Sequence, residues 1–522
     1  MRRFVPPQPP KTKAKTYAAP RRGWIKNENL AISKPEGASV LTNWFPTATG
    51  CRVRKGTDQY ATIGSAAVTA LMVYTVGASD KFFAADASNI YDITTIADAD
   101  TAPTATVTGL AGGGWQYAQF ATDGGTFLVA VNAADDYYVY DGTDWTNDTY
   151  AITGVDSSTL NYVWGYQKRL FFTKKDSLDA YYLPVNQIAG KASVIPLGGV
   201  FRLGGSLLFG ATWSVDSGSG LQESCVFVTT EGEIAIYVGS NPTSADSWQL
   251  KGVYQCGKPL GARAWMRAGG DLLIATDIGL VPLSQAVAKD KAALAMGSVS
   301  FPIEDAWVEA AQLRQSLPWS VEVWPTRQLA MIGTPTTTGQ NTEVFVVNVR
   351  TGAWAPWDGD DVRCLALFKD RFFYGTSDGS IVEIEVGGSM LGEPYTATCA
   401  MLFDDIGSGI SYKNAVMVKP TILAPNDPEA QVFAMADYII DVPSIPSAGP
   451  SPEDVSVWGT AKWGSSKWGQ KRAQQRFGDW AGVTAHGQAL APGVQITIGG
   501  TVEPDIDLVS LTLLYETGAA VV

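Results

Sequence analysis

The chain has 522 residues, of which 46% are hydrophobic and 17% charged, so its composition excludes a disordered protein and supplies material for a large core. Its 54 Gly and 28 Pro, together with 17 Trp, 20 Tyr and 19 Phe, favour many short strands and turns over long helices. No apolar run approaches 18 residues, which excludes a membrane-spanning helix. Because His486 is the single histidine, two-histidine zinc sites are excluded, and we expect no metal and no cofactor.

The first 26 residues are basic and proline-rich. They hold eight Lys or Arg side chains and no acidic residue. The rest of the chain, residues 27–522, therefore contains 30 basic and 51 acidic residues, a net charge of −21. Such a segment is expected to be an extended arm, either a solvated tail or a contact with an acidic neighbouring surface. An acidic body would repel nucleic-acid phosphates. The candidate intersubunit contacts are Arg2, Arg3, Lys11, Lys13, Lys15, Arg21 and Arg22.

A hairpin-like unit recurs along the middle of the chain. It consists of an apolar strand, a small polar turn and a second strand, as in residues 81–93. Several copies start about 45 residues apart, the length of one four-stranded propeller blade. We therefore predict an all-β fold with a β-propeller of about six to eight blades over residues 60–391, and we consider a parallel β-helix less consistent with the repeat length. The other copies begin at Phe127, Leu170, Val226, Leu272, Val344 and Phe372.

Two helical stretches interrupt the strand pattern within residues 284–317. Ser284 is a candidate N-cap for a helix that Gly297 would end. Pro302 would open a second helix that runs to Leu317, before Pro318. Both are expected to form an insertion between blades.

The pattern changes after residue 391. A Pro/Ser-rich loop at 441–454 leads into Trp-Gly pairs at Trp458, Trp463 and Trp468, and the C-terminal end alternates like paired strands. We predict a β-sandwich-like domain over 392–522, with residues 27–59 packed on the β domains. The Trp-rich loop could stack on sugars or bases, or anchor the core. Its basic residues could contact phosphates or an acidic neighbouring subunit: Lys462, Lys467, Lys471, Arg472 and Arg476.

No enzymatic motif is complete. Residues 252–259 approach a P-loop, but Pro259 replaces the Ser or Thr that would hold Mg²⁺, so a strand-linking turn is the better interpretation. The adjacent carboxylate pairs, such as Asp135/Asp136 and Asp404/Asp405, are typical of solvated turns. The five dispersed cysteines indicate buried apolar residues in a reducing compartment. We expect a protein that is not an enzyme.

Several segments resemble the nozzle or tail-hub proteins of short-tailed bacteriophages. The resemblance is found in residues 27–56, which contain the motifs Asn43-Trp44-Phe45-Pro46 and Arg52-x-Arg54-x-Gly56. It is also found in residues 139–145, 231–261, 267–284 and 504–518. The resemblance implies a β-propeller plus a platform domain in a six-fold ring below the portal and adaptor. It carries no catalytic residues.

The expected function is that of a structural virion protein, a ring-forming tail subunit whose lumen conducts or retains DNA without sequence-specific binding. Expected partners are copies of itself, the head-to-tail adaptor, the portal complex and tail fibres, and the location is the virion tail after assembly in the bacterial cytoplasm. The alternative is a carbohydrate-binding or carbohydrate-hydrolysing propeller. That alternative needs arginines gathered at one propeller mouth, for which the candidates are Arg202, Arg263, Arg267, Arg314 and Arg350.

Overall fold

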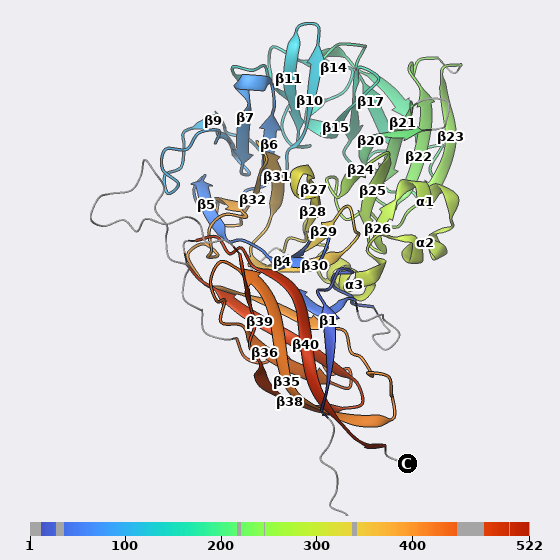
Figure 1. The fold of residues 1–522 in the computed structure, drawn as a ribbon. Helices are drawn as coiled ribbons and strands as arrows, with labels where there is room; N and C mark the ends of the chain where they lie inside the picture. Colours follow the sequence, from blue (N-terminus) through green and yellow to red (C-terminus); the bar gives the residue numbers. More distant parts are fainter. Residues whose placement is uncertain are drawn as a thin grey trace, which may run out of the picture. The chain divides into compact units, whose positions relative to one another are not determined.

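The computed structural model describes residues 12–27, 36–216, 221–244, 246–336, 342–445, 474–500 and 502–520, most of them in strands (Figure 1). The chain divides into two compact units. The propeller unit comprises residues 59–344 and 360–384, and the sandwich unit comprises residues 1–58, 345–359 and 385–522. Among the described residues, no helix is long and apolar enough to cross a membrane.

Seven antiparallel sheets follow one another along the propeller, which confirms the predicted fold. The first strand of each sheet contacts a strand of the next, and the last sheet contacts the first, so the sheets close into a ring of seven blades. The first three blades hold β6 (Ala70–Tyr74), β7 (Lys81–Ala85), β8 (Asn89–Asp92) and β9 (Ala105–Thr108); β10 (Gln116–Thr122), β11 (Gly125–Val131), β12 (Tyr138–Tyr140) and β13 (Trp145–Thr146); and β15 (Leu160–Tyr166), β16 (Arg169–Lys174), β17 (Asp179–Tyr182) and β19 (Ser193–Pro196).

The remaining blades follow the same plan, with a three-stranded fifth blade. They hold β20 (Leu207–Asp216), β21 (Leu221–Thr229), β22 (Glu233–Gly239) and β23 (Trp248–Gln255); β24 (Trp265–Ala268), β25 (Asp271–Thr276) and β26 (Gly279–Pro282); β27 (Ser320–Trp324), β28 (Leu329–Gly333), β29 (Thr342–Asn348) and β30 (Trp354–Asp360); and β31 (Cys364–Phe368), β32 (Arg371–Gly375), β33 (Ser380–Ile384) and β5 (Thr57–Thr62). The seventh blade therefore takes its last strand from the N-terminal part of the chain. The short strands β14 (Ile152–Thr153) and β18 (Gly190–Lys191) pair in parallel.

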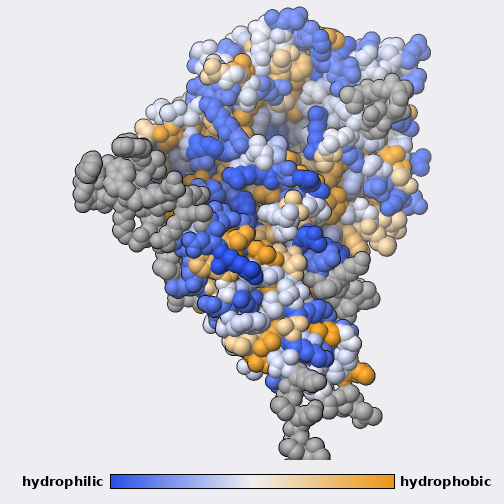
Figure 2. Space-filling model, viewed as in Figure 1, coloured by the Kyte–Doolittle hydropathy of each residue, from blue (hydrophilic) through white to orange (hydrophobic). Residues whose placement is uncertain are grey.

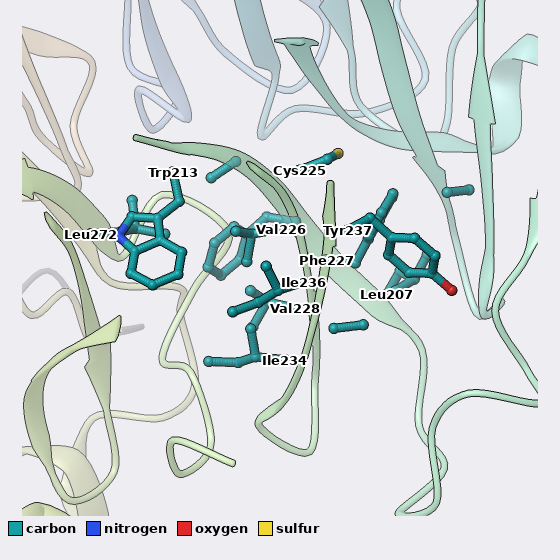
Figure 3. Packing of buried hydrophobic residues seen from close by; sticks show 14 of the residues in the cluster. Leu207, Trp213, Cys225, Val226, Phe227, Val228, Ile234, Ile236, Tyr237 and Leu272 are labelled. Carbon is teal, nitrogen blue, oxygen red and sulfur yellow. The ribbon is translucent and has the colours of Figure 1, made fainter. Parts of the chain in front are cut away.

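Apolar side chains fill the spaces between blades. In one such cluster Val226, Phe227 and Val228 of β21 pack with Ile234 and Ile236 of β22, all fully buried (Figure 3). One hairpin cannot bury both of its faces, and the neighbouring blades supply the missing contacts. The five cysteines are unpaired and four of them are buried, as predicted for small apolar residues.

The helical insertion lies between the fifth and sixth blades, but its predicted bounds were wrong. It consists of α1 (Leu283–Ala288), α2 (Lys291–Gly297) and α3 (Glu304–Leu313). Ser284 lies inside α1 and is not its N-cap, because its hydroxyl donates instead to the Asp271 carboxylate at 2.5 Å. The first predicted helix breaks at Lys289, whose backbone is extended, and the second ends at Leu313, before Leu317.

The sandwich unit contains two sheets, as predicted. One joins β3 (Trp44–Pro46), β4 (Cys51–Val53), β40 (Asp507–Ala520), β35 (Ser411–Ala424) and β37 (Gln475–Phe477), with β1 (Thr12–Ala18) paired to β40 and β38 (Ala481–Gly487) paired to β35. The other sheet has the order β2 (Ala38–Thr42), β34 (Tyr395–Met401), β39 (Leu490–Ile498) and β36 (Gln431–Ala436). Residues 345–359 and 385–391 group with this unit by their contacts, although β29 and β30, which include most of residues 345–359, pair into the sixth blade.

Candidate functional site

The N-terminal arm is an integral strand of the sandwich unit from Thr12 onward. Its seven residues pair antiparallel with β40, from Thr12 opposite Glu516 to Ala18 opposite Ser510. Tyr17, Trp24 and Ile25 are buried. From Thr12 to Ala18 the predicted arm is extended, but as a strand paired within its own unit, and Tyr17 is the buried residue of this strand.

The predicted basic contacts separate into three groups. Lys13, Arg21 and Arg22 are exposed, whereas Lys15 forms an ion pair with Asp404 of the same unit. Arg476 is exposed on β37. The remaining candidates, together with Trp458, Trp463 and Trp468, lie outside the described residues: Arg2, Arg3, Lys11, Lys462, Lys467, Lys471 and Arg472.

The Asn43 and Arg54 positions of the resemblance form a buried structural cluster. The Arg54 side chain is 1% exposed; its Nε donates to Asn43 Oδ1 at 2.9 Å, and its guanidinium lies 4.3 Å from the centre of the Tyr395 ring. The Tyr395 hydroxyl donates to the Arg54 carbonyl. At Gly56 an added Cβ would collide with the backbone of Ser389. These residues fix the fold of the sandwich unit.

A second polar cluster lies among the innermost strands of the propeller. The Arg263 guanidinium carbon lies 3.8 Å from the centre of the Tyr117 ring, and Arg263 Nε donates to Gln116 Oε1 at 3.0 Å. Gln116 and Tyr117 begin the second blade, whereas Arg263 leads into the fifth. Because these blades are not neighbours in the ring, the Arg263 side chain must cross the propeller axis. Its contacts with Gln116 and Tyr117 link the second and fifth blades at this level.

Glu322 of the sixth blade belongs to the same cluster. Burial raises the pKa of its carboxyl to about 7, although the nearby Arg263 guanidinium acts to lower it. Arg263 also acts to lower the pKa values of Tyr162 and Cys364, which burial raises. The cluster thus joins five blades through one cation. Of this cluster, only Arg263 was a predicted candidate. Glu322 could have been found as the one acidic residue between Val321 and Val323 in an otherwise apolar strand.

Replacing Glu322 by Gln is expected to remove a pH dependence of stability. Between pH 4.5 and 7 the folded state holds more protons than the unfolded state, so the free energy of unfolding falls as pH rises. The loss amounts to at most about 3 kcal/mol. Urea denaturation across this range should show the free energy of unfolding falling more steeply with pH in native protein than in Glu322→Gln. The exposed Asp123→Asn is the control, and an equal slope in native protein and Glu322→Gln contradicts the assignment.

The arginines required by the carbohydrate alternative do not gather. Arg263 lies at the axis, Arg314 donates to the Thr334 carbonyl at 3.3 Å, and Arg202 and Arg267 are exposed. Arg350 belongs to the sandwich unit. Among the described residues, no group of three or more His, Cys, Asp or Glu side chains could hold a metal ion.

The near-P-loop is a strand and a turn. Gly252–Gln255 lie in β23, and the Lys258 ammonium pairs with Glu231 Oε2 at 2.8 Å. Asp135 accepts the backbone N–H groups of Ala111 and Gly112, as expected of a turn carboxylate. Neither feature has the geometry of a catalytic site.

Net charge is unevenly divided between the two units. The propeller unit holds 18 of the 38 basic residues and 32 of the 51 acidic residues, which gives it a net charge of −14. The sandwich unit holds the other 20 basic and 19 acidic residues. Residues 82–167, within the first three blades, contain eleven acids and no Lys, Arg or His. Blue, hydrophilic residues are prominent on the face shown in Figure 2. The propeller therefore has a surface that repels polyanions.

No family model and no curated protein matches this chain. Solved structures resemble it in fold. The β-propeller domain of Cps50 (Swd1) from Myceliophthora thermophila is 13% identical, with 63% of this chain and 99% of that chain covered and a TM-score of 0.38. YCF48 bound to D1 peptide is 9% identical (69% and 97% covered, TM-score 0.36), and BBS1N in complex with ARL6DN is 10% identical (67% and 100%, 0.36). All three concern the propeller fold alone.

Proposed function

We propose that this chain is a structural virion protein, a ring-forming subunit of a short phage tail that surrounds the DNA path below the portal and adaptor. The observation that carries the proposal is the division of charge: an acidic propeller of net −14 is joined to a unit without excess negative charge that carries the basic N-terminal segment. The sequence resemblance supplies the prior expectation.

The acidic propeller suits a wall past which DNA must slide. Phosphates bound by Lys and Arg displace counterions and hold DNA in place, whereas a surface of like charge leaves it mobile. Because Arg263 spans from the fifth blade to the second, the path for DNA in this proposal lies in the lumen of the ring and not through any one propeller. The partners are further copies of this chain, the adaptor, the portal and tail fibres, and the location is the virion tail.

The basic segment provides the contact between subunits in this proposal. Each exposed contact contributes about 0–1 kcal/mol, but several contacts per subunit repeated around a ring act together. Salt weakens them, because the Debye length falls from ~10 Å at 0.1 M to ~3 Å at 1 M.

We expect the purified chain to form rings of about six copies that dissociate at high salt. Replacing Arg2, Arg3, Lys11, Lys13, Arg21 and Arg22 by Ala should weaken assembly at low salt, measured by light scattering and negative-stain images. Lys15 is retained because it pairs with Asp404 within its own unit.

The matched control removes six exposed charges from the propeller, at Lys168, Lys175, Lys191, Arg202, Lys251 and Lys289, and should assemble normally. A monomer under all conditions would refute the ring. Normal assembly of the arm variant at every salt concentration would refute the role of the arm.

A further inference from the structure

A cavity of about 650 Å³ opens on the four-stranded sheet of the sandwich unit. This volume lies within the range of small-molecule sites in proteins, about 300–1,000 Å³. Its floor is formed by residues of β2, β34 and β39, and its walls include Asn43, Asp358, Met390, Val442 and Ile445. The cavity belongs wholly to one compact unit.

Strand register gathers hydroxyl groups on the floor. Thr42 and Gln495 lie on either side of Thr398 in one row across the sheet, and Thr396 pairs with Thr497 in the next row. The hydroxyls of Thr396 and Thr497 are 2.9 Å apart. The opposite face of the same strands carries the buried Cys399 and Val494, which belong to the interior of the unit.

Gln495 supports this floor: it is buried in the same row of the sheet and is not among the described residues that line the cavity. Its Nε2 donates to Thr398 Oγ1 at 3.3 Å and to the Pro443 carbonyl at 3.5 Å. Because the Thr398 hydroxyl accepts from Gln495, its own proton can be donated to a ligand hydroxyl in the cavity.

The charge of the lining restricts the ligand. Among the described residues that line the cavity, Asp358 is the one charged residue, and it is exposed. Because this described part of the lining holds no Lys, Arg or His to balance an anion, it disfavours phosphates and carboxylates. Val40, Met390 and Val442 provide apolar surface for C–H groups.

We propose that this cavity binds a neutral saccharide, with hydroxyls paired to Thr398 and Asp358, and that Gln495 positions the Thr398 hydroxyl. The proposal is independent of ring assembly, and it places sugar binding in the sandwich unit and not on the propeller.

The test is saturation-transfer NMR and calorimetry of the full chain with glucose, galactose, N-acetylglucosamine, maltose and lactose. We expect at least one of them to bind with a Kd of about 1 mM or below, the strength of a few net hydrogen bonds. Glucose 6-phosphate and glucuronic acid should bind at least tenfold more weakly than their neutral parents.

Two near-isosteric variants, Thr398→Val and Gln495→Met, should weaken binding at least tenfold, while Thr512→Val, on β40 of the other sheet, should not. Gln495→Met also tests folding, because replacing an incompletely paired buried group should preserve the melting temperature. The proposal is overturned if none of the five sugars binds, if the charged sugars bind as well as the neutral ones, or if the two cavity variants bind like the native chain.

Discussion

Deletion of residues 1–26 is expected to unfold the sandwich unit and to leave the propeller unit folded. The deletion removes the seven-residue pairing of β1 with β40 and three buried side chains, Tyr17, Trp24 and Ile25. Truncating one buried aromatic side chain to Ala already costs about 3–5 kcal/mol. The combined loss is comparable with the whole stability of an ordinary domain, about 5–15 kcal/mol.

Hydrogen exchange read by mass spectrometry distinguishes the two units. In the deletion variant, peptides from β40 should lose their protection, while peptides from β7 and β21 should keep theirs. The matched control deletes residues 1–11 alone and retains β1, so its β40 should exchange like that of the native chain. Native protection of β40 in the longer deletion would show that the arm contributes little to the sandwich unit.

Gly232→Ala is expected to destabilise the propeller by about 3 kcal/mol or more. Gly232 forms the turn between β21 and β22 with a φ of 83°, a conformation that costs a non-glycine residue about 1–2 kcal/mol. In addition, a Cβ would collide with the Gly257 carbonyl, and relieving such a clash in packed structure costs about 1–3 kcal/mol.

Gly198→Ala is the control, because an added Cβ there meets no atom within 4 Å. Urea denaturation followed by tryptophan fluorescence compares the two variants. We expect a lower transition midpoint for Gly232→Ala and a midpoint within error of the native chain for Gly198→Ala. Equal midpoints would mean that the turn moves to accommodate the methyl group.

The sequence predicted the propeller because each blade contains a local hairpin. The predicted copy at 81–93 covers β7 and β8, and the copy at Val226 covers β21 and β22. The alternation of apolar and polar residues and the turn residues are local signals, so seven copies of the hairpin unit could be recognised. The predicted number of blades was six to eight. Pairings between distant segments carry no such signal. For that reason the strands β1 and β5 were not predicted.

The polar cluster at the axis was only partly predictable. A single acid between valines marks Glu322 as unusual, but nothing in the sequence places Arg263 beside Tyr117, 146 positions away. The saccharide cavity is harder still, because Thr398 and Gln495 are 97 positions apart and meet only through strand register. Threonines in strands are ordinary, so their gathering on one floor is a property of the fold.

The seventh blade has a consequence for how the chain is made. Its outer strand, β5, ends at Thr62, whereas β33, the strand beside it, ends at Ile384, so a ribosome must add some 320 residues before the two can pair. At about 5–20 residues per second, this takes roughly 16–65 s. During that time β5 is an unpaired strand, and its residue Ala61 is not yet buried as it is in the folded propeller. Until β33 is made, β5 is therefore exposed to pairing with the edge of another strand.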